Sequence, residues 1–158
     1  MKFLALLAGC LLSGSVVACT YDEANQLAKL RELAKSNSGY LNEAAQEVTW
    51  KGAIGEKYSV VYGGCSHLGH QITVTNLLNK LPSEPELFAI TQKLADDLWW
   101  NGEGELLKRA LKRGEFTRNV SPGNARFDIL GTDYSEMYVE YRKEAGAVVV
   151  ALGWNRSF

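Results

Sequence analysis

Short runs in which apolar and polar side chains alternate constrain this chain more than any other feature of its sequence. Ile72 and Val74 alternate with Gln71, Thr73 and Thr75. A period of two residues places the apolar set on one face of a β-strand and the polar set on the other. We therefore expect an antiparallel sheet that is covered on one side only. Such β-rich runs fall at residues 58–62, 71–78, 116–120, 126–130, 136–142 and 147–152.

Two helices are expected between the second and third of these runs. Ser83 and Glu86 form a capping box and Pro85 lies in the first turn, which is typical of a helix start. Apolar residues then recur every three or four positions, and a second helix follows over residues 103–113. The two should form a helical hairpin. A third helix is expected near the N-terminus, over residues 21–36.

The segment 40–47 is ambiguous, because Leu41, Ala44 and Ala45 allow a short helix, and residues 48–50 are expected to be extended. The expected fold class is α+β: an antiparallel sheet of five or six strands, with an N-terminal helix and an inserted helical hairpin on one side. No internal repeat is evident in the sequence.

The first nineteen residues predict export from the cytoplasm. Lys2 is followed by an almost wholly apolar run over residues 3–19, broken only by glycines and serines. A charged start, an apolar middle and a small-residue end are typical of a secretory signal peptide. The expected domains are a signal peptide at 1–18 and a single α+β domain at 19–158, and a permanent membrane anchor is the alternative to cleavage.

The last residues of this run suggest how the chain is processed. Val16, Val17 and Ala18 precede Cys19. This order resembles the lipobox of bacterial lipoproteins, and the resemblance covers residues 1–19 only. It implies that Cys19 becomes the first residue and carries a membrane-anchoring lipid; Thr20, in place of a retaining aspartate, favours the outer membrane. The alternative is an ordinary cut after Ala18, which releases a soluble periplasmic or secreted protein.

The charge of the expected mature chain argues against nucleic acid as a partner. Removal of residues 1–18 removes one lysine, Lys2, so 16 basic residues face 18 acidic residues. A small negative charge offers no attraction for phosphate backbones or anionic lipid surfaces. With 46% hydrophobic residues and four tryptophans, the chain is expected to bury a core that needs no metal, disulfide or cofactor.

One glycine-rich segment holds both histidines of the protein and the only cysteine outside the first nineteen residues. Cys65, His67 and His70 lie within six residues, and zinc accepts ligands of these types. A structural zinc site needs a fourth ligand, so we expect no metal here. Cys65 with either histidine is also a candidate nucleophile–base pair. If Cys19 carries no lipid, a Cys19–Cys65 disulfide is a further alternative.

A contact surface is expected around this segment. Trp100 and residues 63–70, with Cys65, His67 and His70, are the predicted binding residues, because exposed tryptophan buries a large area at low entropic cost. The expected function is binding of a partner protein in the cell envelope, as an inhibitor, an immunity-type protein or an assembly accessory. A small envelope enzyme that uses Cys65 with His67 or His70 is the alternative.

Overall fold

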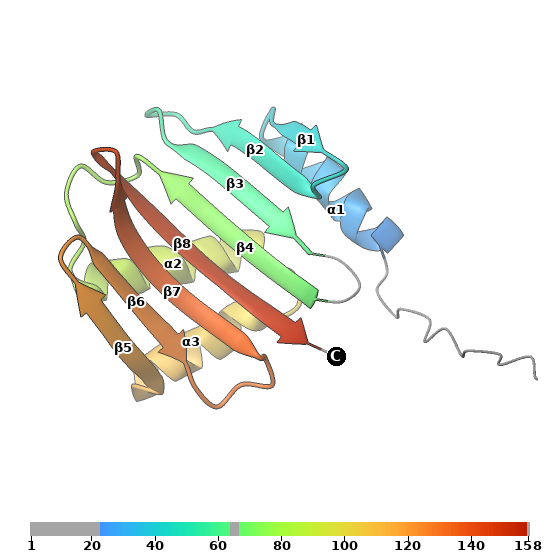
Figure 1. Ribbon diagram of the computed structural model, residues 1–158. Helices are drawn as coiled ribbons and strands as arrows, with labels where there is room; N and C mark the ends of the chain where they lie inside the picture. The colour runs from blue at the N-terminus through green and yellow to red at the C-terminus, as the bar shows by residue number, and fades with distance from the viewer. Residues whose placement is uncertain (1–22, 64–66, 158) are drawn as a thin grey trace, which may run out of the picture.

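The computed structural model describes residues 23–63 and 67–157, which form an antiparallel sheet with three helices on one of its faces (Figure 1). The helices are α1 (Glu23–Ser36), α2 (Glu84–Leu98) and α3 (Glu103–Arg113). The strands are β1 (Tyr40–Asn42), β2 (Glu47–Lys51), β3 (Lys57–Tyr62), β4 (His67–Thr75), β5 (Phe116–Ser121), β6 (Asn124–Ile129), β7 (Glu136–Glu144) and β8 (Ala147–Ser157). They lie in the order β1-β2-β3-β4-β8-β7-β6-β5. No helix within these two ranges is long and apolar enough to cross a membrane.

The expected sheet of five or six strands is wrong, because the described residues form eight strands; the class α+β holds. The additional strands are β1 and β2. The short helix allowed near β1 is replaced by a turn, in which Ala45 N–H donates to Asn42 Oδ1 (3.2 Å) and Gln46 has a φ of 49°. β2 is held by its pairing with β3, where Val48 lies opposite Val60 and both are fully buried. The spacing of apolar residues within one segment does not show which strands pair.

The three helices follow the predicted pattern closely. α1 is helical from Glu23, the first described residue, and ends at the predicted position. The capping box of α2 is confirmed, since Ser83 N–H donates to the carboxylate of Glu86 (2.7 Å). α3 covers the predicted residues and ends at Arg113, with Gly114 as its C-cap.

The core lies between the sheet and the helices. Leu30 of α1, Leu87 of α2 and Leu107 of α3 are fully buried, as are Ile72 of β4 and Leu152 of β8. Burial of each such side chain contributes about 1.5–3 kcal/mol of transfer free energy. The helices therefore cover the apolar face that the alternation predicted.

The strand order is symmetric about the centre of the sheet, so a pseudo-two-fold axis normal to the sheet relates the two halves of the chain. The first half forms the meander β1–β4 and the second half forms the meander β5–β8. Their last strands, β4 and β8, pair antiparallel in the centre. A helix precedes each meander on the same face: α1 packs on β1 and β2, and α3 packs on β6. This correspondence was not evident in the sequence.

The two corresponding helices also end alike. The residue that follows the last turn adopts the left-handed conformation in both, with φ of 50° at Ser38 and 70° at Gly114. The next backbone N–H donates to the carbonyl of Ala34 in α1 (2.7 Å) and of Ala110 in α3 (3.0 Å). Both are the hydrogen bond of a Schellman motif.

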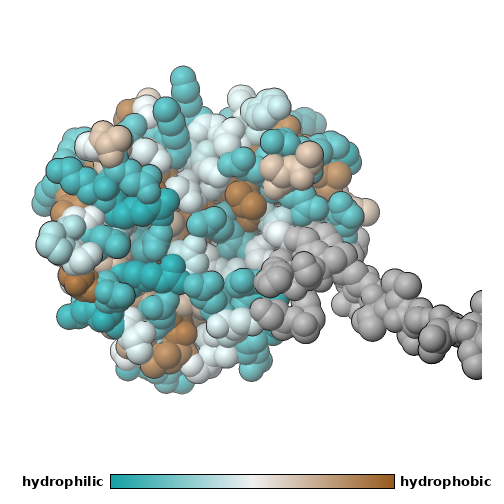
Figure 2. Space-filling view, viewed as in Figure 1, coloured by the Kyte–Doolittle hydropathy of each residue, from teal (hydrophilic) through white to brown (hydrophobic). Residues whose placement is uncertain are grey.

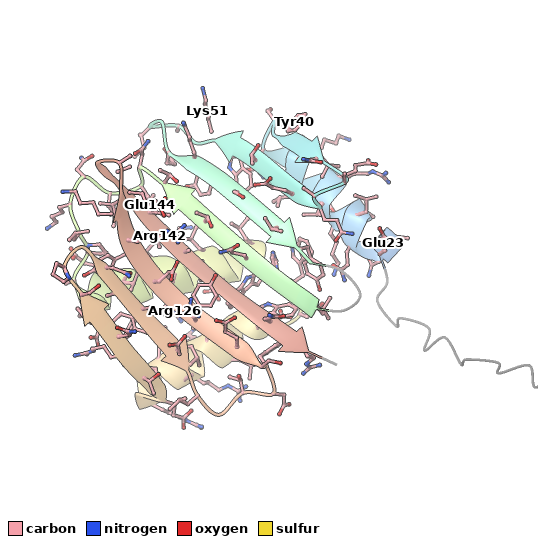
Figure 3. The ribbon with its side chains drawn as sticks, viewed as in Figure 1. Glu23, Tyr40, Lys51, Arg126, Arg142 and Glu144 are labelled. Carbon is pink, nitrogen blue, oxygen red and sulfur yellow. The ribbon has the colours of Figure 1, made fainter. Side chains whose placement is uncertain are left out.

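The face of the sheet that carries no helix is mostly polar (Figures 2 and 3). Arg126 on β6 forms ion pairs with Asp128 (2.8 Å), Glu136 and Glu140 (3.5 Å). Its guanidinium carbon also lies 3.9 Å from the ring centroid of Tyr138. The charges of these side chains are paired with one another, which agrees with a sheet whose second face is exposed to water.

We expect the two helix ends to respond in opposite directions to substitution. Ser38→Gly removes the steric cost of a Cβ atom in the left-handed conformation and should raise the free energy of unfolding by about 0.5–1 kcal/mol. Gly114→Ser should lower it by a similar amount. Urea unfolding of both variants and the parent measures the changes. A loss of stability in Ser38→Gly would mean that the serine side chain itself holds this helix end.

Candidate functional site

The structure brings together two of the four residues that were predicted to bind. His70 lies on β4 with its side chain in the core and 2% exposed, and Trp100 follows α2 and is partly buried. Their ring centroids are 4.7 Å apart. His67 begins β4, but its side chain lies outside the described part of the chain, as do Cys65 and Cys19.

His70 and Trp100 belong to a cluster of aromatic rings. Tyr62 of β3 stacks on Trp100, with centroids 5.0 Å apart and an interplanar angle of 16°. Trp154 of β8 meets Tyr62 edge-on at 6.1 Å, and Trp99 lies 6.3 Å from His70. The cluster joins three central strands to the end of α2. Trp100 therefore contributes to packing as well as to the surface.

Burial makes His70 a weak base. Desolvation, and to a smaller degree the positive charge of Lys29 on α1, lower the pKa of His70 from 6.5 to about 3. Its Nε2 has no hydrogen-bond partner among the described residues, and the same is true of the indole nitrogens of Trp99 and Trp154. A general base with so low a pKa is poorly matched to neutral pH. Within the described ranges, no group of three His, Cys, Asp or Glu residues could hold a metal ion.

A groove lies between α1 and α2 on the helical side of the sheet. It encloses about 670 Å³. Trp50 of β2 and Tyr58 of β3 line it with rings stacked at 4.8 Å and an interplanar angle of 1°. Leu33 contributes from α1 and Leu94 from α2. The apolar lining is completed by Leu77, Leu78, Ile90 and Leu98.

The groove continues towards Trp100 and has charged residues along its course. Lys93 and Asp97 of α2 line the first hollow and form an ion pair at 2.6 Å. A second hollow of about 460 Å³ shares Leu33 and Ser36 with the first. Its other lining residues are Lys29, Glu32, Trp99 and Trp100. We call the two hollows together the α1–α2 groove.

The sequence pattern does not predict this groove. Ile90 and Leu94 belong to the apolar stripe of α2, and such a stripe predicts burial. Trp50 and Tyr58 lie opposite each other only because β2 pairs with β3. The groove lies between two helices that are distant along the chain, and no local pattern in the sequence encodes a gap between such elements.

Comparisons with known proteins assign the chain to no family. No protein-family model matches it, and no match was found among curated proteins or among solved structures. The site must therefore be interpreted from its own geometry and chemistry.

We expect the protein to lose stability in acid partly through His70. The unfolded state binds a proton near pH 6.5 and the folded state only near pH 3, so the free energy of unfolding falls as pH decreases between these values. At pH 4.5 the loss from this residue is about 2–3 kcal/mol. Urea unfolding at pH 7 and pH 4.5 should show a smaller loss for His70→Gln than for the parent. Equal losses in both proteins would mean that His70 titrates normally.

Proposed function

We propose that this protein is exported to the cell envelope and acts by binding a partner protein in the α1–α2 groove. The observation that carries the proposal is the first hollow of this groove, which encloses about 670 Å³ between two helices and has mostly apolar walls. Concave, largely apolar sites with a few polar groups are where proteins usually bind ligands. Tryptophan and tyrosine at such sites, here Trp50 and Tyr58, are the residue types that most often dominate the free energy of binding.

The rival proposal, an enzyme that uses Cys65 with a histidine, receives no support from His70. A histidine with a pKa near 3 and 2% exposure cannot readily accept a proton from a thiol at neutral pH. The enzyme proposal then depends on Cys65 and His67, whose side chains lie outside the described part of the chain.

The proposal includes the location of the protein, which is the cell envelope. Residues 1–18 would be removed on export, and Cys19 would carry a lipid that anchors the mature chain in a membrane, with the outer membrane favoured. The described part of α1 starts at Glu23, four residues after Cys19 in the sequence. A lipid there would hold α1, and with it one wall of the groove, close to the membrane surface.

The alternative, a soluble form with a Cys19–Cys65 disulfide, is supported by the short path between the flanking residues. Gln46 Nε2 donates to Glu23 Oε1 (3.3 Å), and Tyr62 N–H donates to the carbonyl of Gln46 (3.1 Å). The start of α1 therefore lies close to the end of β3. Four residues before Glu23 and three after Tyr62 span at most about 14 Å and 11 Å, which is enough to bring two cysteines together.

Intact mass separates these two forms. If Cys19 is lipidated, the mature chain extracted from membranes should be heavier than the chain 19–158 by the mass of the whole attached lipid, including its glyceryl unit. A mass lower by two hydrogens, which returns to the calculated value after reduction, would replace lipidation with the disulfide. Recovery of a chain that still contains Met1 from the cytosol would contradict export altogether.

Charge placed in the groove should weaken binding of the partner strongly. Ile90 lines the groove, whereas Ala89, the preceding residue of α2, is exposed and does not line it. With tagged proteins and quantitative mass spectrometry of envelope extracts, Ile90→Arg should reduce recovery of the partner at least tenfold, and Ala89→Arg should leave it unchanged. Urea unfolding of both variants checks that each is folded. Equal recovery with both would place the binding site elsewhere.

A further inference from the structure

We propose that the edge strand β5 pairs with the β5 of a second copy of this chain, so that two sheets join edge to edge. This edge is separate from the α1–α2 groove, whose strand residues come from β2 and β3. The inference is therefore independent of the proposed function. It follows from the backbone groups that β5 presents at the edge, from the charge on this strand, and from the side chains that a two-fold axis brings together.

β5 has a neighbouring strand on one side only. It pairs with β6 over its whole length without a bulge, and in the described part of the chain no strand lies beyond it (Figure 1). Leu130 N–H donates to the carbonyl of Glu115 (2.8 Å), which continues the same ladder. An antiparallel ladder uses every second residue, so the odd-numbered residues of β5 bond to β6. The backbone N–H and C=O groups of Phe116, Arg118 and Val120 therefore point away from the sheet.

The two edges of the sheet differ in how well they are protected from further pairing. Proteins protect edge strands by making them short, or by placing lysine, proline or a bulge on them. β1 has only three residues, and α1 packs against it. β5 has six residues, of which five are exposed, and it contains no lysine, proline or glycine. Val120 of β5 is 56% exposed. The open edge is therefore β5.

The one charge on β5 is already paired. Arg118 faces the helical side of the sheet, where it forms an ion pair with Glu84 of α2 and its guanidinium carbon lies 5.6 Å from the ring centroid of Phe127. An inward-facing charge discourages pairing when the added strand would bury it without a partner. Here the partner is present. Since β5 carries no other charge, it also offers nothing that would select a strand of opposite charge from another protein.

The sequence of β5 complements itself in one register. The edge groups of one strand must bond to the edge groups of the other, and the two-fold axes that overlap most of β5 pass through Arg118 or through Asn119. An axis through Arg118 places two like charges directly opposite each other, which is destabilising. An axis through Asn119 places Arg118 opposite the copy's Val120 and Thr117 opposite the copy's Ser121. The two Asn119 amides then face each other, and each can donate and accept a hydrogen bond.

We expect a weak dimer. Pairing of one edge strand buries a small area, so the dissociation constant should be roughly 10–100 µM. Two-fold pairing makes the contact self-complementary, and it therefore closes at two copies. Each copy keeps its own groove accessible, because the groove lies over β2 and β3 near the other edge of the sheet.

Two single-cysteine variants of the purified chain test the register. In the proposed pairing the two copies of residue 119 are a non-hydrogen-bonded pair with Cα atoms about 4.5 Å apart, which a disulfide can span. The two copies of residue 117 lie roughly 14 Å apart, which is too far. On oxidation, Asn119→Cys should give a linked dimer whose 119–119 bond is located by mass spectrometry. Thr117→Cys, an equally exposed position on the same face, should give at least tenfold less.

Sedimentation equilibrium of two lysine variants tests which edge associates. Val120→Lys adds a charge opposite the copy's Arg118 and should weaken association at least tenfold. Tyr40→Lys makes the same change at a 71% exposed residue of the other edge strand, β1, and should leave association unchanged. Urea unfolding of both lysine variants checks their stability against the parent.

Three results would contradict the inference. A parent chain that remains monomeric at about 1 mM would overturn a second copy as the occupant of this edge. Dimers that link through residue 117 rather than through residue 119 would overturn the register. Association that is as strong in Val120→Lys as in the parent would overturn pairing through β5. None of these results would affect binding in the groove.

Discussion

The pairing of β4 with β8 is the interaction on which the rest of the structure depends. Residue pairs from His67 with Ser157 to Thr75 with Val149 join the two strands, and no other strand pair among the described residues links the two meanders. Ile72 and Leu152 are opposite each other in this ladder, and both are fully buried. Both strands are central, so the other strands pair outwards from them, β3, β2 and β1 on one side and β7, β6 and β5 on the other. The ladder closes a long stretch of chain, so its entropic cost must be offset by burial of the face below it.

One-sided coverage of this sheet creates the groove. The polar face is satisfied by its own charges, as the pairs around Arg126 illustrate (Figure 3). The apolar face must be covered by helices, and the chain supplies two helices to the second half but only α1 to the described first half. Trp50 and Tyr58 partly compensate, because two stacked aromatic rings shield each other from water. The same rings are left accessible to a ligand.

The aromatic cluster defines one end of that space. Trp99 and Trp100, at the end of α2, pack with Tyr62 and His70 on the sheet, and the ammonium of Lys29 lies 5.1 Å from the centroid of Trp100. α1 and α2 are thus connected at this end through aromatic and cation–π contacts. Of the two histidines that the sequence singled out, His70 therefore serves the structure first: it is neutral, buried and adjacent to the groove rather than part of its lining.

The sequence by itself determined the class of the fold, the three helices and the one-sided character of the sheet. Capping residues such as Ser83 and the alternation around Ile72 and Val74 act within a few residues, so they can be identified without knowledge of the fold. It did not determine β1, the pairing of β2 with β3, the pseudo-two-fold relation or the groove. Val48 is a core residue only because Val60 lies opposite it, and the environment of His70 depends on tryptophans that are remote along the chain. Tertiary structure alone decided these features, because strand pairing and gaps between helices depend on contacts between distant segments, which a local pattern of side chains does not record.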